Sequence, residues 1–136
     1  MKLLRPTDRP SRMAPADKFT GTVLQDPLLR AEEPGRVQAN LVTFLPDART
    51  NWHTHPLGQI LYILSGSGAV QVWGEEVRPV QAGDVVWFAA GEKHWHGSSP
   101  TNSMVHLALT EFLDGKGAEW LEPVADDQYT ARASAT

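Results

Sequence analysis

Apolar and polar residues alternate in short runs along most of the chain, a spacing typical of β-strands. Successive side chains of a strand point to opposite faces, so each run presents one apolar face to a core. Runs about ten residues apart, with Gly-rich turns between them, predict an all-β sandwich or barrel. The expected strands are Phe19–Leu24, Val37–Leu45, Gln59–Leu64, Ala69–Trp73, Val77–Val80, Asp84–Phe88 and Met104–Phe112.

Glycine, proline and aspartate gather where the strands should turn. No helical period appears in the N-terminal half of the chain. The expected turns are Asp26-Pro27 and Glu33-Pro34-Gly35 around a short connector, Pro46-Asp47-Ala48 after the second strand, and hairpins at Gly66-Ser67-Gly68 and Gly74-Glu75-Glu76.

The run Gln59–Leu64 is apolar on both faces, and Asp84–Phe88 is expected to be a buried strand. A strand that is apolar on both faces lies in the middle of a sandwich or under a subunit interface. We therefore expect a homodimer or homotetramer. The two apolar sets are Leu61 and Ile63 on one face and Ile60, Tyr62 and Leu64 on the other.

The chain reads as one domain in three parts, since 136 residues suffice for one sizeable core. Residues 1–18 form a proline- and arginine-rich arm that is loosely held or reaches a partner subunit. Residues 19–112 form the barrel. Residues 113–136 form a covering segment, in which 119–121 and 126–129 are expected to make one or two short helices over an open end.

Composition and charge exclude several classes of protein. Twelve basic and sixteen acidic residues leave a net charge of −4 with no basic run, which argues against a nucleic-acid partner. The absence of cysteine excludes disulfides, thiolate nucleophiles and Cys-ligated zinc. No apolar run approaches the roughly twenty residues of a membrane span, and no apolar stretch follows the basic start. We expect a cytoplasmic protein with a small-molecule substrate and no membrane partner.

All five histidines fall between residues 53 and 106, in three groups. His53 and His55 are two apart, so on a strand they share a face with Cα atoms roughly 6.5 Å apart. Gln59 has the same parity if the strand resumes after the kink at residues 56–58. His94 follows two turns and a hydrophobic run, so a neighbouring strand can bring it to the open side. An H-x-H pair alone is a weak signal, but together these residues indicate one metal site.

The segment from Asp47 to Gly66 resembles the first sequence motif of the cupins. That motif has a glycine, five residues, H-x-H, three or four residues, glutamate, six residues and glycine. Here His53 and His55 form the H-x-H, Asp47 stands where the first glycine belongs, and Gln59 replaces the glutamate.

The segment from Gly83 to His94 resembles the second cupin motif, with Ala89 where proline is usual. The two motifs have the separation found in cupins and span the central half of the chain. The resemblance implies an all-β cupin jelly-roll barrel, and we expect a short helical segment at its C-terminal end.

A closer likeness is to the small bacterial manganese cupins that include the (R)-selective hydroxynitrile lyases. It covers about residues 16 to 129 and rests on Phe19–Val23, Trp52–Gln59, Gly91–Gly97 and Leu113–Lys116. It implies Mn(II) bound by His53, His55, Gln59 and His94, proton transfer by His106, and a cavity lined by Val42, Phe44, Thr50, Leu61, His96 and Thr110. The chain departs from these lyases at Asn40, where they have a small residue, and at Thr110, where they have glutamine.

The proposed donor set carries no negative charge, because Gln59 replaces the usual glutamate. The ion then keeps its full +2 charge, which strengthens it as a Lewis acid and disfavours oxidation to +3. Nitrogen and oxygen donors without thiolate suit Mn(II), Fe(II), Ni(II), Co(II) or Zn(II), and the residues alone do not choose among them. Four protein donors on an octahedral ion leave two positions for water or substrate.

Alternate residues of a strand share a face, and this predicts which other residues lie around that site. His106 shares a face with Thr110, and it is either a general base beside the metal or a histidine hydrogen-bonded within the sheet. His96 shares parity with His94, and we expect it in the cavity wall rather than as a fifth ligand. Asn40, Val42 and Phe44 alternate on one face and are placed on the same wall; ordinary core packing is the alternative for the last two.

Three functions remain open at this point. The first is a metal-dependent lyase that cleaves and forms cyanohydrins, such as mandelonitrile from benzaldehyde and HCN. The second is a small cupin dioxygenase of the quercetinase or alkene-cleaving kind, against which Gln59 argues. The third is a cupin that binds a small ligand without catalysis, against which His106 argues.

Overall fold

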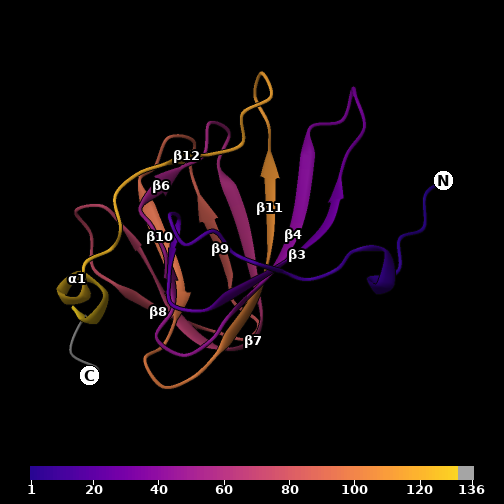
Figure 1. Cartoon of the computed structure of the whole chain (residues 1–136). Coiled ribbons are helices and arrows are strands. Elements are labelled where there is room, and N and C mark those ends of the chain that lie inside the picture. The colour runs from indigo at the N-terminus through magenta and orange to yellow at the C-terminus, as the bar shows by residue number, and fades with distance from the viewer. Residues whose placement is uncertain (132–136) are drawn as a thin grey trace.

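The fold class predicted from the sequence is confirmed. A computed structural model describes residues 1–131, which form strands, one 3₁₀ helix (η1) and one short α-helix (Figure 1). The elements are η1 Pro6–Asp8, β1 Arg12–Met13, β2 Phe19–Thr20, β3 Val23–Arg30, β4 Val37–Phe44, β5 Arg49–Thr50, β6 His53–Thr54, β7 Gln59–Val72, β8 Arg78–Gln81, β9 Val85–Phe88, β10 His94–Ser98, β11 Met104–Glu111, β12 Glu119–Trp120 and α1 Asp126–Thr130.

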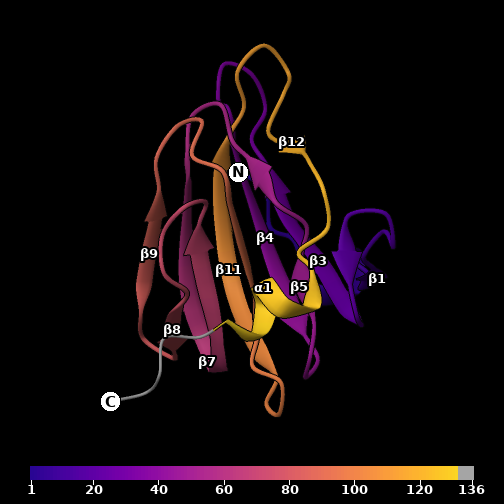
Figure 2. The ribbon, with the colours of Figure 1, turned by 90° about the vertical axis from the view of Figure 1, so that its left-hand side faces the viewer.

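One sheet curls round on itself in the order β1-β3-β4-β11-β7-β10-β5-β2. The long β7 belongs to both halves, because it pairs with β11 and β9 through its first part and with β10 and β8 through its second. Figure 2 shows the strands wrapped around a common interior with α1 beside them. The neighbouring strands are antiparallel, as expected for a jelly roll.

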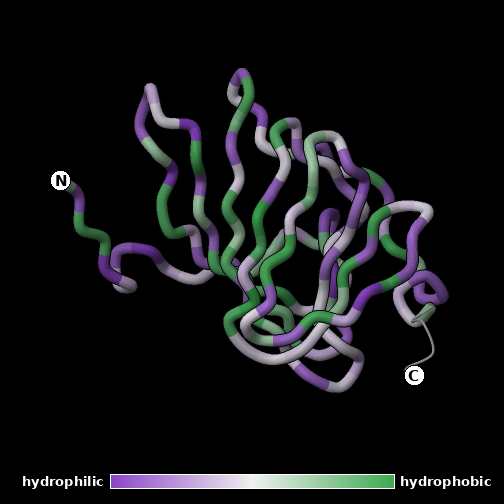
Figure 3. The backbone as a smooth tube through the Cα atoms, turned by 180° about the vertical axis from the view of Figure 1, so that it is seen from behind, coloured by the Kyte–Doolittle hydropathy of each residue, from purple (hydrophilic) through white to green (hydrophobic). Residues whose placement is uncertain are grey.

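Apolar and polar residues alternate along the long strands (Figure 3). The inward residues form one core cluster that fills the barrel. Its buried members are Phe19, Val23, Val42, Phe44, Ala48, Leu61, Ile63, Val70, Val80, Phe88, Met104 and Ala108. This period of two is the physical basis on which the strand predictions succeeded.

The predicted hairpin at Gly66-Ser67-Gly68 is wrong, because β7 runs unbroken through it. Gly66 has φ +77°, and a Cβ there would lie 1.9 Å from the carbonyl oxygen of Ser103. A Cβ on Gly68 would lie 2.0 Å from the carbonyl oxygen of Gly97. These glycines therefore allow close backbone approach where the strand passes between the two halves of the sheet.

The N-terminal strand predictions also need correction. The expected strand Phe19–Leu24 is broken at Gly21, whose φ is +83°, and its two halves, β2 and β3, lie far apart in the sheet order. Asp26-Pro27 does not turn; β3 continues through it with a shift in register. Pro27 pairs with Asn40 of β4 next to this irregularity, and a β-bulge is one of the places where a strand tolerates proline.

The C-terminal part is only partly as predicted. Asp126–Thr130 forms the expected helix, but Glu119–Trp120 forms strand β12, which pairs with β6 so that Trp120 faces His53. The predicted turns at Glu33-Pro34-Gly35 and Gly74-Glu75-Glu76 are confirmed between β3 and β4 and between β7 and β8. The last five residues of the predicted covering segment, 132–136, lie outside the described residues.

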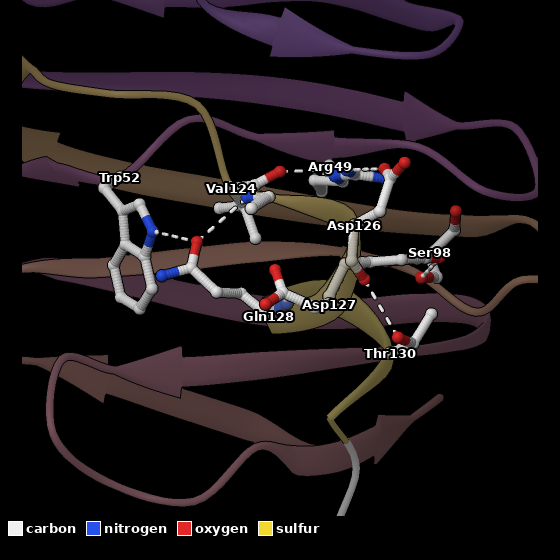
Figure 4. Close-up of polar contacts among 10 residues, drawn as sticks. Arg49, Trp52, Ser98, Val124, Asp126, Asp127, Gln128 and Thr130 are labelled. Carbon is white, nitrogen blue, oxygen red and sulfur yellow. Dashed lines mark hydrogen bonds and ion pairs between the residues drawn. The ribbon is translucent and has the colours of Figure 1, made fainter.

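Helix α1 is tied to the barrel by polar contacts of Arg49 and Trp52 (Figure 4). An Arg49 guanidinium nitrogen donates to the Val124 carbonyl at 2.9 Å and to Asp126 at 2.7 Å. Trp52 Nε1 donates to Gln128 at 3.3 Å. These contacts surround a second apolar cluster formed by Trp52, Ala69, Val77, Trp95, Val124 and Tyr129.

The predicted burial of Asp84–Phe88 is wrong for most of the strand. Val85 is 66% exposed and Trp87 is 59% exposed, while Phe88 is buried. On the adjoining strand, Ile60, Tyr62 and Leu64 are also exposed. The outer face of β7 and β9 is therefore an apolar surface in a single chain. None of the helices among residues 1–131 has the length and apolar character to cross a membrane.

Candidate metal centre

Three short segments bring three imidazoles together inside the barrel. His53 on β6 lies directly opposite His94 on β10, and their ring centroids are 4.2 Å apart. His55 follows β6, with its ring centroid 5.0 Å from that of His53 and 5.3 Å from that of His94. Gly58 has φ +83° and is followed at once by Gln59, the first residue of β7. The kink expected at residues 56–58 is therefore present, and the strand resumes at the residue predicted as the fourth ligand.

The three imidazoles share one hydrogen-bond pattern. Each has Nδ1 within hydrogen-bond distance of a backbone carbonyl, so each donates from Nδ1 and carries its lone pair on Nε2. The partners are the Asn51 carbonyl for His53 at 2.9 Å, the Gly117 carbonyl for His55 at 2.7 Å, and the Glu92 carbonyl for His94 at 2.8 Å. Metal-bound histidines show this arrangement, because the second hydrogen bond fixes the ring and its tautomer.

Buried acceptors in this cluster have no protein partner. They are Nε2 of His55, Nε2 of His94, Nε2 of His96 and Oε1 of Gln59. Gln59 uses its other end, since Nε2 donates to Thr110 Oγ1 at 3.2 Å. Buried polar atoms in folded proteins nearly always have partners, so orphaned acceptors that converge call for a cation. Imidazole nitrogens together with one amide oxygen are donors that suit a divalent ion of the first transition series.

His96 lies closer to this cluster than the sequence predicted. Ligand nitrogens of His53, His94 and His96 all lie within 4.8 Å of one another, so these three could hold a metal ion together. His96 differs in its contacts, however, because its Nδ1 faces His106 Nε2 at 3.0 Å rather than a carbonyl. The ligand set His53, His55, Gln59 and His94 therefore stays a prediction, and His96, whose Nε2 is also buried without a partner, is a further candidate ligand.

Aromatic rings hold two of the imidazoles in place. Phe88 stacks on His94 with centroids 3.6 Å apart, and Trp120 stacks on His53 with centroids 4.4 Å apart. Both histidines are almost fully buried. The rings are therefore fixed before any ion binds, which lowers the entropic cost of binding.

Burial keeps all five histidines neutral at pH 7. It lowers the pKa of His53 and His96 well below 6.5, and positive charge on neighbouring histidines lowers both further. Burial also lowers the pKa of His94 to about 3 and that of His106 to about 4. The pKa of His55 is lowered by burial too, against the opposing effect of its hydrogen bond to the Gly117 carbonyl. Neutral imidazole is the form that binds metals.

His106 on β11 contacts the same cluster from the opposite half of the sheet. Its Nε2 is 3.0 Å from His96 Nδ1, while its own Nδ1 is buried without a partner. The Phe44 ring packs against it with centroids 5.3 Å apart. Since one of the two facing nitrogens must donate, donation from His106 leaves Nδ1 as the nitrogen that can accept a proton.

A cavity of about 350 Å³ opens beside these groups. Residues predicted to line it that do so are Asn40, Val42, Thr50, His96, His106 and Thr110. Phe44 and Leu61 do not line it; both are fully buried in the apolar core. Parity placed Phe44 on the cavity wall and the resemblance to the lyases placed Leu61 there, but neither tells how deep a residue lies along the barrel.

Several lining residues were missed by the sequence reasoning. They are Lys18, Phe19, Gln25, Gln38, Ala108, Phe112, Gly117, Ala118 and Trp120. Parity could have found Gln38, which shares a face with Asn40, and Ala108, which shares one with His106. Trp120 was missed because a helix was expected where β12 forms.

Sequence comparison identifies relatives over almost the whole chain. A family profile described as a cupin domain matches residues 40–110. An (R)-mandelonitrile lyase of Granulicella tundricola is 53% identical over 129 residues, which are 95% of this chain and 98% of that protein.

Known structures show the same fold. A cupin-like protein of Thermotoga maritima superposes with a TM-score of 0.83 at 36% identity, covering 90% of this chain and 94% of that one. The polyketide cyclase RemF of Streptomyces resistomycificus superposes with a TM-score of 0.73 at 18% identity, covering 95% and 90%. At that low identity the second likeness concerns the fold alone.

Proposed function

Because the chain belongs to the cupin family, we propose that it is a metal-dependent lyase that cleaves and forms cyanohydrins. The reaction is that of the mandelonitrile lyase to which it is 53% identical: mandelonitrile gives benzaldehyde and HCN. The observation that carries the proposal is the cluster of orphaned buried acceptors next to the cavity that His106 lines. A metal site and a neutral base are the two parts that such a reaction needs.

We propose His53, His55, Gln59 and His94 as the ligands, and Mn(II) as the ion. All four donors are neutral, so the bound ion keeps its double positive charge. When bound, it supplies Lewis-acid stabilisation for negative charge that develops on the substrate.

The protein supplies the proton acceptor. In cleavage, His106 Nδ1 takes the proton from the cyanohydrin hydroxyl. The oxygen lone pair then forms the carbonyl bond, and the bond to the nitrile carbon breaks with its electron pair on cyanide. The protonated His106 then gives this proton to cyanide, which forms HCN and returns the imidazole to its neutral state, and synthesis is the reverse sequence. His106 can start this step at pH 7 because burial lowers its pKa to about 4, which keeps the imidazole neutral.

We also propose that the protein assembles as a homodimer or homotetramer through the outer face of β7 and β9. Five large apolar residues are exposed there in a single chain: Ile60, Tyr62, Leu64, Val85 and Trp87. Apolar surface of this kind on adjoining strands is typical of an interface between subunits. Sedimentation velocity of the parent and of Trp87→Glu tests the assembly.

Cyanide release tests the function. Untreated protein is analysed for metal, and the same sample is assayed with (R)-mandelonitrile before and after treatment with a chelator. We expect about one divalent ion per chain and cyanide release that the chelator abolishes and added Mn(II) restores. Metal-loaded protein that releases no cyanide above the buffer rate would show that the proposed lyase function is wrong.

A further inference from the structure

One wall of the cavity carries side-chain amides that have few protein partners. Gln25, Gln38 and Asn40 come from the neighbouring strands β3 and β4 and all line the cavity. The single side-chain hydrogen bond among them runs from Gln38 Nε2 to Asn40 Oδ1, at 3.4 Å. Within residues 1–131 the Asn40 Nδ2 and the Gln25 amide have no acceptor. Their N–H groups are therefore free to bind a ligand.

A cation lines the same cavity from the other half of the sheet. Lys18 precedes β2, and its Nζ lies 5.8 Å from the centroid of the Trp120 indole. That indole stacks on His53, so the ammonium is separated from the predicted metal centre by one aromatic ring. Among residues 1–131 no carboxylate lies within ion-pair distance of Lys18.

The cavity as a whole favours negative charge. No described residue that lines it is acidic, and Lys18 is its one lysine. The predicted ligands His53, His55, Gln59 and His94 are all neutral and cannot offset the charge of a bound ion. Two uncompensated positive centres in one concave site attract an anionic ligand and raise its local concentration. Phe19, Phe112 and Trp120 also line the cavity and offer flat apolar surface to the body of such a ligand.

We propose that the substrate carries a carboxylate on the part of the molecule remote from the reacting carbon. The carboxylate pairs with the Lys18 ammonium, and the free amide N–H of Asn40 donates to it across the cavity. The reacting end then lies between His106 and the proposed metal ligands. This inference rests on the proposed function and specifies its substrate: a carboxylated aromatic cyanohydrin or the matching aldehyde.

A substrate with a neutral polar group in place of the carboxylate would use fewer of these cavity residues. A hydroxyl group would use the amides of Asn40 and Gln25 but would leave the Lys18 ammonium without a counter-charge. A carboxylate uses both, since it accepts hydrogen bonds from amides and ammonium alike. A charge-assisted contact of this kind, lost on substitution, typically changes affinity by roughly tenfold or more.

Two aldehydes of similar shape test the proposal: 4-formylbenzoate and the neutral 4-methylbenzaldehyde. Binding of each to the metal-loaded protein is measured without cyanide, by quenching of tryptophan fluorescence. The rate of cyanohydrin formation is then measured with cyanide added. We expect 4-formylbenzoate to bind about tenfold more tightly and to have a higher kcat/KM. The preference should weaken as salt concentration rises.

Variants test which residue causes the preference for 4-formylbenzoate. Lys18→Met keeps the aliphatic stem and removes the charge, so the ratio of the two dissociation constants should fall by about tenfold. Lys18→Arg should keep the preference, and Asn40→Ala should reduce it by a smaller factor. Lys116→Met is the matched control, since Lys116 lies beside Gly117 near the cavity but does not line it, and it should leave the ratio unchanged.

The two proposals fail in different ways. Equal binding of both aldehydes, or a preference that survives in Lys18→Met, would overturn the carboxylate site, even if mandelonitrile is cleaved. Preferential binding of 4-formylbenzoate that depends on Lys18, without cyanohydrin formation from either aldehyde, would support the carboxylate site and contradict the lyase function.

Discussion

Gln59 and Thr110 lie opposite each other on β7 and β11, and Gln59 Nε2 donates to Thr110 Oγ1 at 3.2 Å. The two ends of a carboxamide have nearly the same shape, so their partners decide which end faces the metal site. With its nitrogen engaged by the hydroxyl, Gln59 presents Oε1, a buried acceptor without a partner. Thr110 thus orients the neutral oxygen of the proposed ligand Gln59.

Thr110→Val should weaken metal binding. Valine keeps the branched shape but cannot accept the hydrogen bond, so the Gln59 amide is free to rotate its nitrogen toward the ion. Changes of this kind next to a ligand typically cost 10- to 100-fold in metal affinity. Competition with a chelator for Mn(II) measures the affinity, and Thr110→Ser, which retains the hydroxyl, serves as the control. Equal affinities in all three proteins would mean that Thr110 does not orient Gln59.

Strand parity was enough to predict that the histidines converge. The H-x-H spacing that begins on β6, the kink before Gln59 and the return of His94 on a neighbouring strand follow from a period of two and from turn residues. The same parity placed His106, Thr110 and Asn40 on the cavity side. These features are local in sequence, or repeat along one strand, which is why the residues alone reveal them.

Features that depend on distant backbone could not be predicted. Gly66 was predicted to lie in a turn, because no residue near it in the sequence indicates that the Ser103 carbonyl approaches it. Trp120 was assigned to a helix, although pairing with His53 makes it a strand. Lys18 joins the cavity only because the strand after it, β2, pairs with β5 on the far side of the sheet order. Long-range pairing overrides local propensity in each case.

His94→Ala should abolish metal binding and the stability that the metal provides. An ion that binds only the folded state stabilises it by about 2.7 kcal/mol when its concentration is 100 times its Kd. Added Mn(II) should therefore raise the Tm of the parent but not that of His94→Ala. Metal analysis after gel filtration and thermal unfolding with and without Mn(II) check both effects. A variant that still carries one ion per chain would remove His94 from the ligand set.

His106→Ala should retain the metal and lose most turnover. A positioned general base typically contributes 10²- to 10⁴-fold to a rate. We expect cyanide release from mandelonitrile to fall by that factor while metal content stays at the parent value. The control is Thr43→Ala on β4, which alternates with the inward-facing Val42 and Phe44 and does not line the cavity. If His106→Ala matches the parent rate, the proton acceptor is another group.

Acid should destabilise the metal-free protein through His106. Its pKa is lowered by burial from 6.5 to about 4, so below pH 6.5 the unfolded chain takes up a proton that the folded chain does not bind until about pH 4. Stability therefore falls as the pH falls through this window, by at most about 3 kcal/mol for this group. Urea unfolding of chelator-treated protein at several pH values should show a smaller fall for His106→Gln. Identical slopes for parent and variant would mean that folding does not lower the pKa of His106.

The contact between Arg49 and α1 should stabilise the fold mainly through burial rather than through its ion pair. The Arg49 side chain is 4% exposed, whereas its partner Asp126 is 95% exposed, so solvent screens the pair. Asp126→Ala should therefore cost less than about 1 kcal/mol.

Arg49→Leu should cost more, about 2 kcal/mol or above, because it removes the donor to the buried Val124 carbonyl and the packing of the guanidinium on the Tyr129 ring, 4.5 Å away. Urea unfolding of the two variants and the parent measures both costs. A larger loss in Asp126→Ala than in Arg49→Leu would show that the ion pair, and not the buried contacts, holds α1 on the barrel.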